Sequence, residues 1–302
     1  MKVLVTGATG FLGRRVVPLL VEAGYEVHAP FVEAAPPTVA GVTWHSADLL
    51  AAPEALVKAV RPNELVHLAW YAEHGKFWAS PENLPWVGAS LRLFKAFAES
   101  GGRRVTVAGS CAEYAWGAGH PLDERAPTAP STLYGVAKDA TRRVLEAYAT
   151  IAGLSWSWGR IFLLHGPDED PRRFVSSVID ALADGRVAEM SHGAQVRDFL
   201  HVEDVAGALV AMHRSSVEGA VNLGSGVGVT LLGVAEAIRD QLGGELRPGA
   251  RAAAPDDPAV LRPDVTRLRD EVGFVPKYDA KESLRRTIEG RLALRAQRTS
   301  AS

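Results

Sequence analysis

Apolar and polar positions follow two different rhythms along the first half of the chain. Short runs of β-branched and other apolar residues predict buried strands, and stretches with an apolar residue every three or four positions predict helices. The strands are predicted at residues 2–6, 25–29, 42–45, 65–69, 104–109 and 155–162. The helices are predicted between them, at residues 11–23, 53–61, 86–100 and 132–152. This alternation is typical of an α/β fold with a doubly wound parallel sheet.

The pattern changes after Gly166-Pro167, where charged segments that contain proline surround further helices. These helices are predicted at residues 172–184, 231–242 and 281–293. A strand and helix at 198–214 and a strand at 219–223 are expected to return to the main sheet. The last residues, 295–302, are expected to be frayed.

Two domains are predicted from this change, and 302 residues are enough for two. The division places a dinucleotide-binding domain at 1–166 with 198–223 returning to it, and a smaller, discontinuous C-terminal α/β substrate domain at 167–197 and 224–302.

Composition narrows the possible partners. The chain is 47% hydrophobic and 23% charged, with a net charge of −2 and no long run of like charge, so nucleic acid and membrane surfaces are poor candidates. No apolar stretch approaches the roughly 18 residues of a membrane span, and the N-terminus does not resemble a signal peptide. The single cysteine excludes an internal disulfide and suits a reducing cytoplasm. The histidines show no metal-ligand spacing, so no metal site is expected.

A glycine-rich turn, Gly7-Ala-Thr-Gly10-Phe-Leu-Gly13, joins the first strand to the first helix. Such a turn brings backbone N–H groups and the positive end of the helix dipole to one point, and glycine lets a pyrophosphate approach the backbone. Its position in a βαβα chain indicates a Rossmann dinucleotide site. The predicted contacts are Gly7, Thr9, Gly10, Phe11, Leu12, Gly13 and Arg14, with Asp48 and Leu49 near the adenine.

The choice of dinucleotide depends on the end of the second strand. An acid at its tip would bind the ribose hydroxyls of NAD, but the tip reads Ala29-Pro-Phe31, and Glu33 lies just beyond. Arg14 and Arg15 follow the third glycine and are suited to a 2′-phosphate, although both could equally be solvated. We therefore favour NADP(H) over NAD(H).

Tyr134 and Lys138 lie four residues apart on one face of a predicted helix, and Ser110 closes a predicted strand. A phenol has a pKa of about 10. An ammonium about 4 Å away stabilises the phenolate by roughly 4 kcal/mol at an effective dielectric constant of about 20, which lowers the pKa by about three units. We expect Tyr134 to exchange a proton with a carbonyl oxygen during hydride transfer, with Ser110 holding that oxygen.

With these features in order, the chain resembles the extended short-chain dehydrogenase/reductases, in their nucleotide-sugar epimerase/dehydratase branch. The matching segments are Gly7–Gly13, Val66–Ala69, Ser110 with Tyr114, Tyr134 with Lys138, Arg160–Pro167, Arg197–Ala206, Asn222–Gly226, Arg262–Asp264 and Gly273–Pro276. The resemblance implies an NAD(P) cofactor that also contacts Leu68 and Ala69. It further implies a nucleoside-diphosphate sugar as substrate, the roles argued above for the serine, tyrosine and lysine, and a homodimer packed through helices 86–100 and 132–152.

Departures from the family pattern narrow the reaction. In the family's 4,6-dehydratases an Asp-Glu pair follows the catalytic hydroxyl, whereas this chain has Cys111 and Ala112 there. Glu113 comes next, but its side chain should point to a different face if the segment is extended. We therefore do not expect dehydration.

Candidate substrate contacts follow from the resemblance and from the expected sheet edge. Arg197 and Arg262 match family positions that bind the diphosphate, and arginine binds such oxygens in a bidentate manner. His192 and Gln195 lie close before Arg197. The aromatic segment 70–78, with His74 and Trp78, follows the fourth strand and is expected to line the sugar pocket. Cys111 is interpreted as a wall of the pocket, not a nucleophile.

Three functions are considered. The first is an NAD(P)H-dependent 4-ketoreductase that acts on a nucleoside-diphosphate 4-keto-6-deoxysugar. The second is an NAD-dependent nucleotide-sugar 4-epimerase. The third is a non-catalytic dinucleotide-sensing module, which the intact pair of Tyr134 and Lys138 disfavours.

Overall fold

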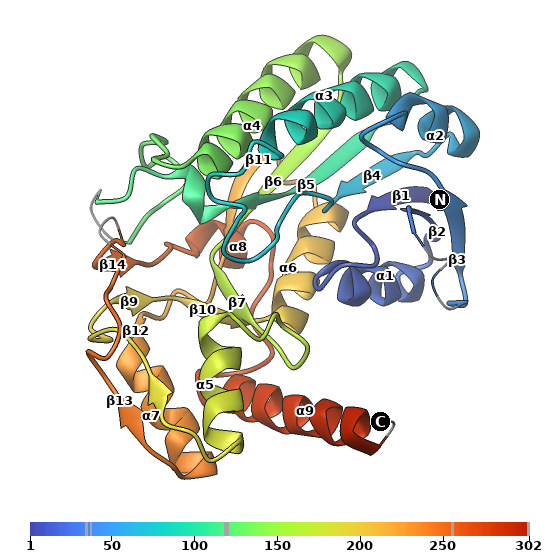
Figure 1. Cartoon of the computed structure of the whole chain (residues 1–302). Helices are drawn as coiled ribbons and strands as arrows, with labels where there is room; N and C mark the ends of the chain where they lie inside the picture. Colours follow the sequence, from blue (N-terminus) through green and yellow to red (C-terminus); the bar gives the residue numbers. More distant parts are fainter. Residues whose placement is uncertain (34–35, 37, 118–120, 255–256, 301–302) are drawn as a thin grey trace.

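A computed structural model describes residues 1–33, 36, 38–117, 121–254 and 257–300 (Figure 1). Seven parallel strands form the main sheet in the order β11-β6-β5-β4-β1-β2-β3. Their bounds are β1 Lys2–Thr6, β2 Glu26–Phe31, β3 Val42–Ser46, β4 Glu64–His67, β5 Arg104–Ser110, β6 Ser155–Ile161 and β11 Gly219–Leu223. The order reverses between β1 and β4, so the doubly wound α/β prediction is confirmed, and a ligand is expected at the carboxyl edge there.

Helices cover both faces of this sheet (Figure 1). On one face lie α1 (Gly13–Glu22) and α6 (Val202–Arg214), and on the other lie α2 (Pro53–Val60), α3 (Asn83–Glu99) and α4 (Leu133–Ala152). The apolar residues that recur at helical spacing form the buried stripes: α1 buries Val16, Val17 and Leu20 against one core, and α4 buries Leu145 and Ala149 in the other.

The second half of the chain builds a third core beside the sheet from α5 (Phe174–Ala183), α7 (Leu231–Leu242) and α9 (Ala280–Ser300). Small sheets accompany it: β7 (Leu163–His165) with β10 (Phe199–His201), β9 (Val196–Arg197) between β12 (Val229–Thr230) and β14 (Val260–Leu261), and β8 (Ala188–Glu189) with β13 (Leu246–Arg247). The short α8 (Thr266–Asp270) packs near β11, and a 3-10 turn, η1 (Cys111–Glu113), follows β5.

Two local predictions are wrong. Strand β10 pairs with β7 and does not join the main sheet, whereas β11 does. The chain end predicted to fray continues as α9 to Ser300, and Arg291 and Arg295 tie this helix to the half-buried carboxylate of Asp180 on α5. Residues 301 and 302 lie outside the described residues. The proposed domain boundaries stay a prediction. Within the described ranges, no helix combines the length and apolar character that crossing a membrane requires.

Candidate active site

A cleft of about 1040 Å³ opens along the carboxyl ends of β1, β2, β3 and β4. Its size is at the upper end of the range of about 300–1,000 Å³ usual for small-molecule sites. The predicted cofactor residues that line it are Gly7, Thr9, Gly10, Arg14, Asp48, Leu49 and Ala69. Trp70 and Trp86 also line it. The cleft therefore lies at the reversal in strand order, where the sequence placed the dinucleotide.

Two positions of the turn require glycine because other backbone atoms come too close to leave room for a Cβ. Gly7 has a φ of +70°, and a Cβ there would lie 2.7 Å from the backbone nitrogen of Ala69. A Cβ on Gly13 would collide with the carbonyl oxygen of Gly7. The loops after β1 and β4 and the start of α1 thus meet without side chains between them, which leaves backbone exposed to a pyrophosphate. These residues fit a dinucleotide.

A buried chain of hydrogen bonds holds the same loops together. Thr6 Oγ1 lies 2.7 Å from His67 Nδ1, and His67 Nε2 lies 2.9 Å from Ser90 Oγ on α3. Burial lowers the pKa of His67 to about 3, so the imidazole is neutral. Ser90 donates to the carbonyl of Trp86, so it accepts from His67 Nε2–H, and Nδ1 accepts from the Thr6 hydroxyl. Thr6 then accepts from the backbone N–H of Ala69 in the cleft.

Other predicted cofactor residues are not among the residues that line this cleft. Leu12 and Leu68 pack against the hydrophobic core, and the ring of Phe11 lies under the guanidinium of Arg15, 5.0 Å from its centre. Phe11 and Leu12 were predicted from their place in the turn and Leu68 from the family resemblance, and their apolar side chains are partly buried by packing.

The two arginines expected to meet a 2′-phosphate already share an anionic partner. Asp168, after β7, accepts a hydrogen bond from Arg15 Nη1 at 3.1 Å and lies 2.6 Å from Arg14 Nη2. Glu33 lines the cleft beyond β2. An acid at this place favours the ribose hydroxyls of NAD, so the preference for NADP(H) drawn from the sequence is not supported.

The predicted catalytic hydroxyls come together where η1 meets α4. Ser110 caps η1, its Oγ accepting from the backbone N–H of Ala112 at 3.2 Å. Gly135 packs against the same turn, and a Cβ there would collide with the carbonyl oxygen of Ala112. This contact brings the side chain of Ser110 close enough to the phenol of Tyr134 to lower its pKa against the effect of burial.

Lys138 is buried one turn further along α4, with 3% of its surface exposed. Its Nζ donates to the carbonyl of Ala108 at 2.9 Å and lies 4.0 Å from the centre of the Trp70 ring. That ring is held in place because Trp70 Nε1 donates to Asn83 Oδ1 at 2.9 Å. Burial lowers the pKa of Lys138 to about 7, against the opposing effect of Glu113.

The pKa of Tyr134 moves in the direction opposite to the one expected. Burial raises it to about 12, although the hydrogen bond with Ser110 and the charge of Arg173 lower it. From the sequence, Lys138 was expected to be a cation close to the phenol that lowers its pKa, whereas the folded chain desolvates the ammonium, which donates to the carbonyl of Ala108. Tyr134 is therefore protonated at neutral pH and suited to donate a proton.

Aromatic side chains enclose the phenol. Trp78 and Phe77 pack edge-on against the ring of Tyr134, with centroids 5.7 and 4.9 Å away, and Trp116 packs against Trp78. The backbone N–H of Tyr134 donates to the carbonyl of Trp78 at 3.1 Å. The aromatic segment after β4 thus contacts the predicted catalytic residue, as a pocket wall would.

The structure brings some predicted substrate residues to this place and not others. Arg197 is near enough to Cys111 to lower the pKa of its thiol, yet burial dominates and raises that pKa to about 12. A protonated thiol fits a pocket wall and not a nucleophile. His74 lies beside the loop of Arg172 and Arg173. Burial is the main effect that lowers the pKa of His74, and the charges of the two arginines lower it further.

The remaining candidates are engaged elsewhere. Arg197 and Gln195 both bind Asp257, with Arg197 Nη2 2.5 Å and Gln195 Nε2 3.0 Å from its carboxylate oxygens. His192 is exposed and accepts from the backbone N–H of Ala194. No described contact joins His192 or Arg262 to the catalytic residues. Their roles stay predictions.

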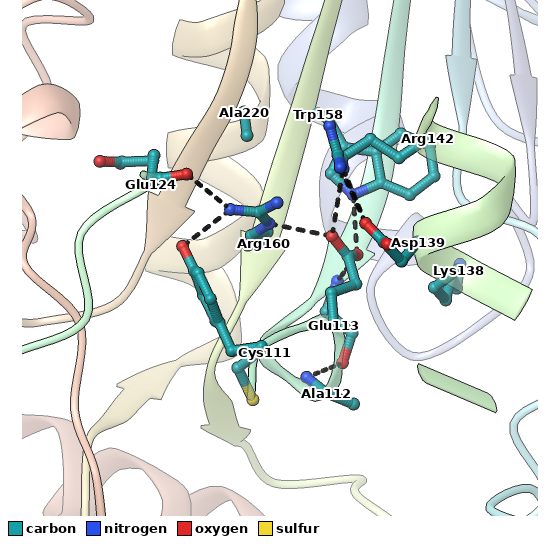
Figure 2. A network of polar contacts seen from close by, with 12 residues as sticks. Cys111, Ala112, Glu113, Glu124, Lys138, Asp139, Arg142, Trp158, Arg160 and Ala220 are labelled. Atoms are coloured by element: carbon teal, nitrogen blue, oxygen red, sulfur yellow. Dashed lines mark hydrogen bonds and ion pairs between the residues drawn. The ribbon is translucent and has the colours of Figure 1, made fainter. Parts of the chain in front are cut away.

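Sequence reasoning missed several residues of the site. Asp257 was overlooked, although an acid in the predicted substrate domain was available to pair with Arg197. The position of Trp70 over Lys138 has no signal in spacing, because the two residues are 68 positions apart. Glu113 was expected to point elsewhere from an extended segment. It belongs to a 3-10 turn, and its buried side chain points toward Trp158 and Arg160 (Figure 2).

Comparison with known proteins decides the family. The model of the NAD dependent epimerase/dehydratase family matches residues 3–224. The chain belongs to this family. The resemblance to extended short-chain dehydrogenase/reductases of the nucleotide-sugar branch is confirmed, and the protein is an enzyme of that class.

Two curated members of the family illustrate its range. The dTDP-6-deoxy-L-talose 4-dehydrogenase (NAD(+)) of Aggregatibacter actinomycetemcomitans is 30% identical over 216 residues, covering 68% of this chain and 77% of its own. The UDP-glucose 4-epimerase of Streptomyces lividans is 28% identical over 303 residues, covering 91% of both chains.

A solved structure of the family also superposes closely. MoeE5 in complex with UDP-glucuronic acid and NAD is 30% identical, with a TM-score of 0.87, covering 97% of this chain and all of that one. This chain therefore shares its fold with a protein whose structure contains both a nucleotide sugar and NAD.

Proposed function

We propose that the protein is an NAD(H)-dependent 4-ketoreductase of a nucleoside-diphosphate 4-keto-6-deoxysugar. The observation that carries the proposal is the convergence of Ser110 and a protonated Tyr134 where η1 meets α4, with Cys111 and Ala112 where a dehydratase has its carboxylates. A phenol that holds its proton at neutral pH is a donor for a developing alkoxide.

Each residue has a defined role in this proposal. NAD(H), when bound, supplies the hydride that forms the new C–H bond at C4. Tyr134 donates its phenolic proton to the C4 oxygen, so that a ketone becomes an alcohol. The Oγ of Ser110 accepts a hydrogen bond from the N–H of Ala112. Its hydroxyl proton can therefore be donated to the C4 oxygen of the substrate. Lys138 holds the nicotinamide ribose.

The relatives support reaction at C4. One curated relative is a 4-dehydrogenase of a dTDP-6-deoxysugar that uses NAD(+), and another is a 4-epimerase of UDP-glucose. Both act at the carbon that the proposal names. Pairing of Arg14 and Arg15 with Asp168, together with Glu33 in the cleft, supports NAD(H) as the dinucleotide.

A 4-epimerase is the second candidate, because the epimerase relative spans 91% of this chain while the dehydrogenase spans 68%. An epimerase oxidises and re-reduces the same carbon with a dinucleotide that is retained.

One experiment separates the two. The purified protein is analysed for bound dinucleotide, then incubated with NADH and a panel of nucleoside-diphosphate 4-keto-6-deoxysugars. The reductase proposal expects NADH consumption matched by sugar reduction. Retained NAD, with interconversion of 4-epimers and no net NADH consumption, would reject it in favour of the epimerase.

We further propose that Arg197 binds the substrate diphosphate in place of Asp257. The carboxylate and the diphosphate would each present oxygens to the same guanidinium, so Asp257 must release it first.

The protein is proposed to form a homodimer through α3 and α4, which lie side by side (Figure 1). This pair of helices exposes apolar side chains, among them Leu84, Val136, Val144 and Ile151, the last with 84% of its surface exposed. A second copy would bury them.

A further inference from the structure

A buried carboxylate lies directly behind the predicted catalytic serine. Glu113 ends η1, and its side chain is fully buried. Its Oε1 accepts a hydrogen bond from the backbone N–H of Ser110 at 2.8 Å and another from Trp158 Nε1 at 2.8 Å. Glu113 therefore holds the backbone of Ser110 from inside the protein, where Trp158 and Arg160 point toward its carboxylate (Figure 2).

Arg160 on β6 aims this carboxylate. Its Nε donates to Glu113 Oε2 at 2.9 Å, and its Nη1 donates to the hydroxyl of Tyr114 at 3.0 Å and to the carbonyl of Glu124 at 3.1 Å. Arg142 on α4 adds a more distant charge, 3.9 Å from Oε2. With every oxygen occupied by a donor, the carboxylate has one orientation.

The backbone is shaped to admit this arrangement. Gly109 precedes Ser110, and a Cβ there would collide with Trp158 Nε1 and lie 2.8 Å from Glu113 Oε1. At the same time, the Oγ of Ser110 accepts from the N–H of Ala112, which completes a capping box. The backbone N–H and the Oγ of Ser110 are therefore both held by hydrogen bonds, and the hydroxyl proton is the part of the serine that can still change direction.

We propose that Glu113, aimed by Arg160, is a positioning residue that holds Ser110 in the geometry needed to bind the reacting oxygen. The proposal rests on the catalytic role proposed above for Ser110. The carboxylate stays inside the protein, so it neither touches substrate nor takes part in elimination. Its charge also raises the pKa of Lys138 against the effect of burial, so it acts on a second catalytic group from behind.

The test compares two double variants that differ in one acceptor. Both E113L/R160M and E113Q/R160M remove the buried charges, a change that proteins often tolerate when volume is kept. Only the Gln amide oxygen still accepts from Ser110. We expect E113L/R160M to lose about 100-fold in kcat, the effect of misplacing a reacting group by roughly 1 Å. KM should stay within about threefold, and E113Q/R160M should recover most of the loss.

A matched control is Y114F, which removes a partner of Arg160 without touching Ser110. Its kcat is expected to stay close to that of the parental protein. An equal loss in Y114F, or a kcat for E113L/R160M within about threefold of that for E113Q/R160M, overturns the proposal.

Amide hydrogen exchange supplies a readout that needs no substrate. The Ser110 N–H should be protected in the parental protein and in E113Q/R160M, and should exchange faster in E113L/R160M. If no nucleotide sugar is turned over by the parental protein, the proposed function fails while exchange still decides the positioning. If E113L/R160M does not fold, unprotected exchange of Ser110 in the parental protein by itself refutes the inference.

Discussion

The buried ammonium of Lys138 makes the stability of the protein depend on pH in a defined direction. Burial lowers the pKa of Lys138 from 10.5 to about 7. Between these values the unfolded chain binds a proton that the folded protein does not, so the free energy of unfolding rises with pH. From about pH 7 to about pH 9 the gain from this one group is about 2 kcal/mol, as an order of magnitude.

The variant K138M removes this titration and keeps the apolar stem against Trp70. Urea unfolding is followed by tryptophan fluorescence at both pH values, without added dinucleotide. The difference in unfolding free energy between the parental protein and K138M should grow in favour of the parental protein by about 2 kcal/mol as the pH rises. Titrations of Cys111 and Tyr134 occur in both proteins and cancel in this comparison.

An exposed lysine provides the control. Lys58 lies on the solvent side of α2, and K58M should show a difference that does not vary with pH. If the K138M difference is equally flat, the ammonium is not desolvated.

Four further outcomes are expected. Y134F should lower kcat by about 10²–10⁴-fold while NADH binding, measured by fluorescence, stays unchanged; loss of binding would contradict a purely catalytic role. G13A should destabilise the protein by about 1–3 kcal/mol and weaken NADH binding, because its methyl group collides with the turn, and normal binding would show that the turn yields. D168A should free the two arginines of α1 and strengthen NADPH binding relative to NADH, and an unchanged ratio in a binding titration would remove their part in selectivity. Replacing Val144 and Ile151 together by Asp should give monomers by size-exclusion chromatography, and an unchanged elution volume would place any dimer contact elsewhere.

The secondary structure of the main sheet and its flanking helices could be predicted because these elements are buried in a regular way. Strands β1 to β6 and helices α1 to α4 lie within a few residues of their predicted positions, since a doubly covered parallel sheet imposes continuous apolar runs on its strands. The end of α9 could not be predicted in this way. Its last turns are polar, and they are held by ion pairs with Asp180, 115 positions away from Arg295.

The candidate site shows the same division. Ser110, Tyr134 and Lys138 were found from residue type, spacing and position after a strand or within a helix. The preference for NADP(H) was not supported, because the partner of Arg14 and Arg15 comes from a loop more than 150 positions away. Glu113 was seen in the sequence but given no role, since its role depends on Arg160 and Trp158 from a different strand.

Local periodicity and the order of short motifs thus determined the fold class, the place of the cleft and the choice of candidate reacting groups. Those properties depend on which atoms a short stretch of chain can present. Ionisation and orientation were decided by the tertiary structure. Desolvation of Lys138 and Tyr134, the carboxylate behind Ser110 and the partner of the α1 arginines all arise from contacts between distant segments, and spacing along the chain carries no record of them.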